Sequence, residues 1–199
     1  MNKAPLNGRE GQKINLGLLL QNSAKQYGFK PFVTQAETGE HLTYTEFNKL
    51  TNHIAHGLID LSFSDEEYIA IMLPSCIQFL ACSYALKKIG VIEVAINSNA
   101  RGPSLARMIN MTKCKILITS GEHLQQLSEI SESLKHLQQV IMIDEHQTAK
   151  ELLQSFNILP WQSLLSQSSS NFSCDFSDEE TAVILFTSGT TGVSKGCDI

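Results

Sequence analysis

The sequence predicts an α/β fold, a largely parallel sheet with flanking helices. Apolar runs of strand length alternate with helical patterns along most of the 199-residue chain. The clearest unit is the apolar run 68–73, which is followed by a helical pattern over 77–89 and a second apolar run over 91–96. A strand, a helix and a strand within about 30 residues are typical of a right-handed parallel crossover.

The N-terminal part is predicted to hold a helix, a hairpin and a second helix. Apolar residues at helical spacing indicate a helix over 14–27 that ends at Gly28. Two short strands are expected over 31–35 and 41–44. Thr43 and Glu46 have the spacing of a capping box, which opens a helix through about residue 61. The buried stripe of this helix is predicted to be Phe47, Leu50, Ile54, Leu58 and Leu61.

The alternation continues after the crossover. Pro103 suits the first turn of a helix that extends to Met111. The later elements are expected to be a strand over 115–119, a helix over 124–137, a strand over 140–143, a short helix near 148–155 and a strand over 182–186. The segment around Trp161 shows no regular pattern, and the serine-rich stretch 166–173 has the composition of a flexible linker.

These patterns divide the chain into four parts. We expect a flexible N-terminus over 1–13, an α/β subdomain over 14–165, a serine-rich linker over 166–176, and a strand with a glycine-rich loop over 177–199.

Composition and charge narrow the classes of function. Hydrophobic residues make up 42% of the chain and charged residues 18%, as in an ordinary globular protein. A net charge of −5 argues against a nucleic-acid-binding protein. The five cysteines are scattered without C-x-x-C spacing, which favours reduced thiols and a cytoplasmic location over a zinc site or disulfides. The most apolar region, 68–96, is too interrupted for a transmembrane segment.

The most informative motif is the glycine-rich stretch from Phe186 to Gly196, directly after the last predicted strand. Glycines let backbone N–H groups approach a ligand, hydroxyls add hydrogen-bond donors, and a lysine adds positive charge, so the stretch suits a polyphosphate. Its glycine spacing excludes a Walker A loop and a dinucleotide-binding fingerprint. The alternative interpretation is a polar surface hairpin that is rich in glycine and threonine.

Residues 187–196 read T-S-G-T-T-G-V-S-K-G, which resembles the T-S-G-T-T-G-x-P-K-G signature of the adenylate-forming acyl-CoA synthetases, also called AMP-dependent synthetases and ligases. Ser194 replaces the usual proline, a change that removes no phosphate ligand. Segments 41–47, 68–75 and 86–97 also resemble elements of this family, in the family's order, although Ala95 stands where proline is usual. The 97–101 region leans toward carnitine-type and fatty-acyl ligases.

The resemblance implies an enzyme that uses ATP, Mg²⁺ and a carboxylic acid to form an acyl-adenylate, from which a thiol, usually coenzyme A, displaces AMP. It assigns no catalytic residue to this chain. The residues that it assigns to the phosphates of ATP are Thr187, Ser188, Gly189, Thr190, Thr191, Gly192 and Lys195. Their hydroxyls and amides would hold phosphate oxygens, and Lys195 would neutralise the leaving pyrophosphate.

The later elements of the family are not found in the chain. They include the adenine-binding segment, the Y-G-x-T-E element whose glutamate helps to hold magnesium, and the C-terminal domain with its lysine. We therefore expect an N-terminal fragment that is inactive alone and self-associates through an exposed sheet edge. The alternative is a catalytically dead module that keeps the fold for protein interaction or regulation.

Other polar residues are expected to have no role in the chemistry. His53 and His56 lie three residues apart on a helix, but no cysteine or aspartate completes a metal site, so we interpret them as solvated surface residues. His123 is interpreted as isolated, and Cys197 is given no role. The acidic run 178–180 precedes a strand and is interpreted as a solvated turn.

Overall fold

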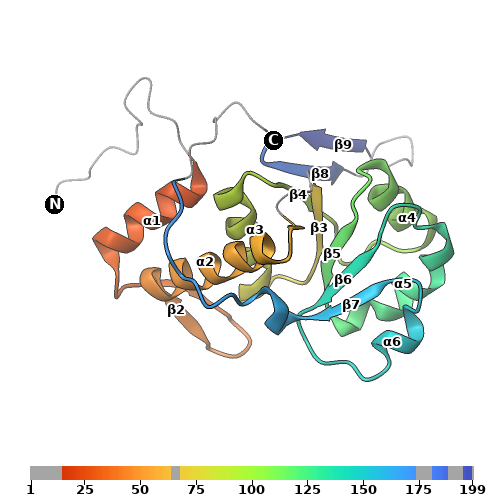
Figure 1. The fold of residues 1–199 in the computed structure, drawn as a ribbon, viewed down its shortest axis with the longest axis horizontal. Coiled ribbons are helices and arrows are strands. Elements are labelled where there is room, and N and C mark those ends of the chain that lie inside the picture. The colour runs from red at the N-terminus through yellow and green to blue at the C-terminus, as the bar shows by residue number, and fades with distance from the viewer. Residues whose placement is uncertain (1–14, 64–67, 174–180, 188–194, 199) are drawn as a thin grey trace.

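The computed structural model describes residues 15–63, 68–173, 181–187 and 195–198. A central sheet lies between helices on its two faces, and the chain crosses from one face to the other as it adds strands (Figure 1). Within the described residues, no helix combines the length and the apolar character needed to cross a bilayer.

Local signals account for the N-terminal elements. Helix α1 (Leu16–Tyr27) begins at Asn15, whose side chain accepts hydrogen bonds from the next turn, and ends at Gly28. Strands β1 (Pro31–Thr34) and β2 (His41–Thr43) form an antiparallel hairpin. The predicted capping box opens α2 (Tyr44–Asp60), because the Thr43 hydroxyl accepts from the Glu46 N–H and the Glu46 carboxylate accepts from the Thr43 N–H.

The main sheet has seven strands in the order β7-β6-β5-β3-β4-β8-β9. Their bounds are β3 Tyr68–Met72, β4 Ile92–Ala95, β5 Ile116–Thr119, β6 Gln139–Met142, β7 Asn157–Pro160, β8 Val183–Thr187 and β9 Lys195–Asp198. All neighbours from β7 to β8 pair in parallel, and β9 pairs antiparallel with β8. The prediction of a largely parallel sheet is therefore confirmed.

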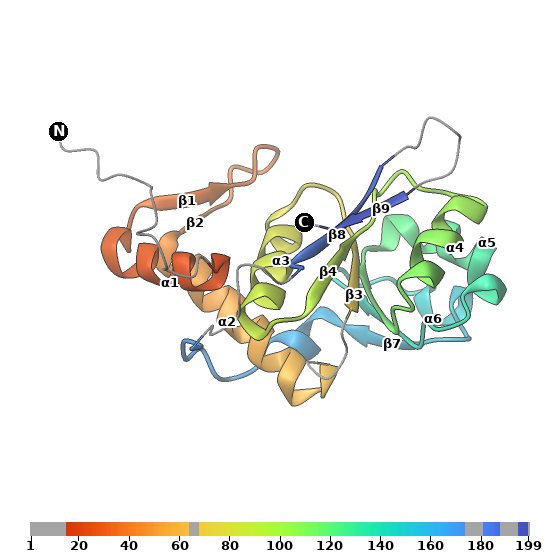
Figure 2. The ribbon, with the colours of Figure 1, turned by 90° about the horizontal axis from the view of Figure 1, so that it is seen from above.

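Right-handed crossovers explain which helices cover which face. The connection from β3 to β4 runs through α3 (Ile77–Ile89), and the chain then reverses direction along the sheet. Helices α4 (Gly102–Met111), α5 (Leu124–Ile130) and α6 (Ala149–Leu152) belong to the connections that run the opposite way, so they cover the opposite face (Figure 2). The reversal lies between β3 and β5, a topological switch point.

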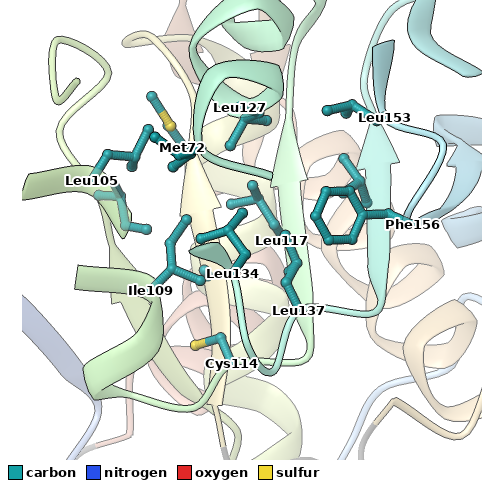
Figure 3. Close-up of a cluster of buried hydrophobic side chains, with 14 of the residues drawn as sticks. Met72, Leu105, Ile109, Cys114, Leu117, Leu127, Leu134, Leu137, Leu153 and Phe156 are labelled. Carbon is teal, nitrogen blue, oxygen red and sulfur yellow. The ribbon is translucent and has the colours of Figure 1, made fainter. Parts of the chain in front are cut away.

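Two apolar cores fill the spaces on either side of the sheet. Ala70 and Met72 of β3 point to the core under α4 and α5, while Ile69 and Ile71 of the same strand point to the core under α2 and α3. Figure 3 shows the first core, where Leu117 of β5 lies among Leu127 of α5, Leu134 and Leu137. Strands buried on both faces need continuous apolar runs, which is why the runs predicted these strands.

The buried face of α2 and the C-terminus of α3 lie where the sequence predicts them. Phe47, Ile54 and Leu58 are fully buried, while Leu50 and Leu61 at the edges of the stripe are partly exposed. Helix α3 ends at Gly90, which adopts a left-handed conformation with φ of 74°.

The helix predicted over 124–137 is shorter in the structure. Helix α5 ends at Ile130, a single 3₁₀ turn (η3, Ser131–Ser133) follows, and Leu134 is extended. The Asn110 side chain donates to the Ser133 carbonyl and accepts from the Lys135 N–H, which holds the chain in this non-helical path. Leu134 and Leu137 are buried nevertheless, so their apolar spacing reflects burial and not one continuous helix.

Two elements near Trp161 depart from the sequence expectation. Residues without a regular pattern form β7, the edge strand beside β6, and a 3₁₀ helix, η4 (Trp161–Leu164). The serine-rich residues 166–172, which we call the strap, lie along α2 and are not detached as a linker would be. Their composition suggested flexibility, but their backbone carbonyls accept hydrogen bonds from polar side chains of α2.

The strap explains His53 and His56, which are not solvated surface residues. The ring of His53 donates to the Ser166 carbonyl at 2.8 Å. The His56 ring lies 3.0 Å from the Ser170 carbonyl and stacks against Phe172 with ring centroids 4.4 Å apart. Both side chains are partly buried, so they connect α2 to the strap.

A buried polar network joins the strap to α3. Asn48 and Asn52 of α2 both donate to the side chain of Asn171. Their own side-chain oxygens accept from the ammonium of Lys88, which also donates to Thr51 at 2.7 Å. Lys88 is only 1% exposed, and this set of oxygens replaces its hydration.

Candidate phosphate-binding site

The glycine-rich loop leaves the sheet at the carboxyl end of β8 and returns as β9. Thr187 is the last residue of β8, Lys195 is the first of β9, and the two are paired in the antiparallel register. The backbone ladder therefore closes the base of the loop. Ser188, Gly189, Thr190, Thr191 and Gly192 lie outside the described residues, so their assignment to phosphate stays a prediction, as do the roles of the Thr187 and Lys195 side chains.

Strand β8 is anchored in the sheet through alternating contacts. Ile184 and Phe186 pack against the core under α4, and Leu185 between them is 39% exposed. Backbone hydrogen bonds with β4 pair Ala95 with Leu185. A rigid parallel neighbour thus sets the position and direction in which the chain enters the loop.

The loop after β4 lies beside this entry point, because Asn97 follows Ala95 by two residues as Thr187 follows Leu185. The Asn97 side chain accepts from the Asn99 N–H at 2.8 Å, which tightens the turn. The Arg101 guanidinium donates to the Ser98 and Ala100 carbonyls of the same loop. The turn at the carboxyl end of β4 is therefore polar, and it lies at the edge where ligands bind in parallel α/β sheets.

A second polar cluster lies at the carboxyl end of β5, next to the switch point. His123 is 2% exposed, with Nδ1 3.2 Å from the Thr119 hydroxyl and 3.1 Å from the Ser120 hydroxyl. Thr119 donates its own proton to the Met72 carbonyl, so it can only accept from His123. This arrangement places a proton on Nδ1 of His123, which is not the isolated residue that the sequence suggested.

Burial controls the titration of His123. Loss of solvent lowers the pKa of this imidazole below its ordinary value, although the neighbouring Glu122 carboxylate acts in the opposite direction. The Thr119 contact requires only a proton on Nδ1, and it is burial that favours the neutral form of the ring. The sequence carried one usable signal for this cluster, since Thr119 ends a buried strand and Ser120 and His123 come within the next four residues.

No metal site emerges from the described residues, among which no group of three His, Cys, Asp or Glu side chains gathers closely enough to hold an ion. The acidic run 178–180 lies outside the described residues. Cys197 on β9 is exposed.

Comparisons with known proteins agree with the loop sequence. A family model described as "AMP-binding enzyme" matches residues 20–199. The chain is 29% identical over 177 residues to a crotonobetaine/carnitine–CoA ligase of Escherichia coli O17:K52:H18, covering 87% of this chain and 34% of that protein. It is 25% identical over 170 residues to 4-coumarate–CoA ligase 3 of Arabidopsis thaliana, covering 84% of this chain and 28% of that one.

Solved structures share the fold. The R395G mutant of the coronafacic acid ligase from Pectobacterium brasiliense matches with a TM-score of 0.78 and 20% identity, over 93% of this chain and 34% of its own. The chain thus spans about a third of the length of the curated relatives that it matches first. Since the family match extends over most of the sequence and includes the glycine-rich loop, the chain belongs to the AMP-binding enzyme family, the adenylate-forming acyl-CoA synthetase superfamily.

Proposed function

We propose that this chain is the N-terminal, phosphate-binding part of an ATP-dependent carboxylic acid–CoA ligase. The observation that carries the proposal is the position of the glycine-rich loop. The loop connects β8 to β9 at the carboxyl edge of a parallel sheet, and its sequence matches the signature of the family to which the chain belongs. Relatives named as ligases of carnitine and of 4-coumarate support a carboxylic acid as the substrate.

In the proposed reaction, a carboxylate oxygen of the acid attacks the α-phosphorus of ATP. The bond between that phosphorus and the bridging oxygen breaks, and its electron pair leaves with pyrophosphate. Amides at Gly189 and Gly192 and hydroxyls at Thr187, Ser188, Thr190 and Thr191 hold the β- and γ-phosphates in line for this attack. Lys195 neutralises the charge that develops on pyrophosphate.

The thiol of coenzyme A then attacks the acyl carbon and AMP leaves. We assign no magnesium ligand to this chain, because no cluster of ligating side chains occurs among its described residues. The lean of the 97–101 region toward carnitine-type and fatty-acyl ligases favours an aliphatic acid. The proposal also includes the absence of adenylation by the 199 residues alone, and their self-association through the edge strand β9.

A fusion tests the proposed function. The 199 residues replace the corresponding part of the E. coli crotonobetaine/carnitine–CoA ligase, and ATP–pyrophosphate exchange is measured with a panel of carboxylic acids. We expect exchange, and we expect Lys195→Ala to lower it by at least about tenfold through loss of charge on the leaving group. Lys135→Ala, at an exposed lysine two residues after η3, is the matched control and should leave exchange unchanged.

Equal exchange in the Lys195→Ala and Lys135→Ala fusions would contradict the role of Lys195. The isolated 199 residues should show no exchange with any acid, and turnover by them at the rate of the fusion would contradict the dependence on the missing parts. A folded fusion that exchanges with no acid would favour the regulatory alternative. Circular dichroism checks that each protein is folded.

A further inference from the structure

A cavity of about 460 Å³ lies at the carboxyl ends of β6 and β7. These strands are at one side of the sheet, and β8 and β9, which flank the glycine-rich loop, are at the other side. The apolar part of its lining, which we call the floor, includes Met142, Ile158, Leu159 and Trp161. This volume lies in the range of pockets that hold small organic ligands. Carboxyl ends of parallel strands are also where such ligands bind in α/β folds.

The cavity is separate from the proposed ATP site. Strands β5, β3 and β4 lie between β6 and β8, so four strand spacings, or about 19 Å at ~4.8 Å each, separate the two strands. A ligand in the cavity therefore does not occupy the space of the triphosphate. The cavity has no part in the reaction proposed above.

Charged groups line the rim of the cavity. Asp144 and Glu145 follow β6, and Lys150 is the second residue of α6. One oxygen of Asp144 accepts from the Gly121 N–H at 2.8 Å, which anchors this turn to the end of β5. His146 also lines the cavity and packs against Gly121. The two carboxylates outnumber the one ammonium, so the rim favours a positively charged ligand.

We propose that this cavity binds an organic ammonium ion with an apolar body, such as an alkyltrimethylammonium. The aromatic face of Trp161 attracts a cation that cannot donate hydrogen bonds. The apolar floor accommodates an alkyl chain, and Asp144 and Glu145 supply the opposite charge. A carboxylic acid of similar size meets two like charges at the rim, and a hydrated metal ion gains nothing from the apolar floor.

Trp161 makes the proposal directly measurable, because it is the only tryptophan in the chain. Its fluorescence is recorded while the purified chain is titrated with butyltrimethylammonium, hexanol or hexanoate. We expect a saturable change with butyltrimethylammonium at a dissociation constant in the millimolar range, weaker binding of hexanol and no saturation with hexanoate. Hexanoate binding as tightly as butyltrimethylammonium would overturn the proposal, and so would the lack of a saturable change.

Charge variants provide a test that depends on sign. Glu145→Gln should weaken butyltrimethylammonium binding about two- to fivefold, and Lys150→Gln should strengthen it by a similar factor, as expected for partly exposed charges. Glu151→Gln on α6 is the matched control, because Glu151 is exposed and does not line the cavity. Shifts of the same sign in Glu145→Gln and Lys150→Gln, or shifts as large in the control, would refute the charge argument.

Discussion

Gly57 of α2 provides a sharp test of how the chain returns from β7 toward β8. Helix α2 lies against η4 at this residue, and a Cβ added to Gly57 would lie 2.0 Å from the Leu164 carbonyl oxygen and 2.5 Å from its carbon. Real Cβ contacts essentially never fall below 3.0 Å, so Gly57→Ala must separate α2 from η4 by about 1 Å. The obstacle is backbone, so no side-chain rotation can relieve it.

The expected cost follows from opposing terms. Alanine in a helix interior gains about 1 kcal/mol over glycine. Overpacking costs about 1–3 kcal/mol or more. Separation also weakens the packing of buried Leu164 and two hydrogen bonds between His53 and Ser166, each worth about 1 kcal/mol. We therefore expect Gly57→Ala to lower the free energy of unfolding by about 2–4 kcal/mol.

Urea unfolding measures this loss, with circular dichroism for the whole fold and Trp161 fluorescence for η4 itself. Gly121→Ala is the matched control: its Cβ meets Cδ2 of the exposed His146 ring at 2.5 Å, and that ring can rotate away. The control should change stability by less than about 1 kcal/mol. A Gly57→Ala protein as stable as the wild type, or more stable, would refute the packing of η4 on α2.

Two further predictions concern local hydrogen bonds and pH. Thr43→Ala removes the capping box and should lower the free energy of unfolding by about 0.5–2 kcal/mol. The backbone and side-chain hydrogen bonds from Thr43 lower the pKa of Glu46, so the stability that they provide exists above the unfolded pKa and is lost as the pH falls through the folded one. Urea unfolding at a series of acidic pH values should therefore show that the free energy of unfolding falls less steeply with pH in Thr43→Ala than in the wild type. An unchanged slope would contradict this. Burial lowers the pKa of His123, so below its ordinary pKa the unfolded state binds more protons and stability falls with the pH. His123→Gln should reduce the loss of stability between about pH 7.5 and 5.5, while the exposed His136→Gln should not; equal losses in both variants would count against the buried, neutral ring.

Where the structural signal is local, the sequence predicted the elements closely. Helix α3 has the predicted bounds, because a proline ends the preceding strand and Gly90 supplies the left-handed end. The capping box at Thr43 formed as predicted, since its hydrogen bonds join two residues only three positions apart in the chain. The parallel strands were found because burial on both faces requires continuous apolar runs.

Prediction failed where distant contacts decide the conformation. The apolar spacing of Leu134 and Leu137 suggested a helix, but Asn110 holds that segment in a turn. The serine-rich strap resembles a linker by composition, yet His53, Asn52 and the stacked pair of His56 and Phe172 hold it on α2. No local sequence pattern predicts such distant contacts.

The same division holds for the candidate site. The T-S-G-T-T-G sequence by itself determined the family and the expected ligand, because the glycines and hydroxyls that suit a polyphosphate occur in one continuous segment. Only the tertiary structure decided that β8 lies beside β4, that the loop therefore begins next to the Asn97 turn, and that an unrelated cavity opens at the far edge. Strand order arises from right-handed crossovers and from the packing of helices on both faces, which join residues far apart in the chain.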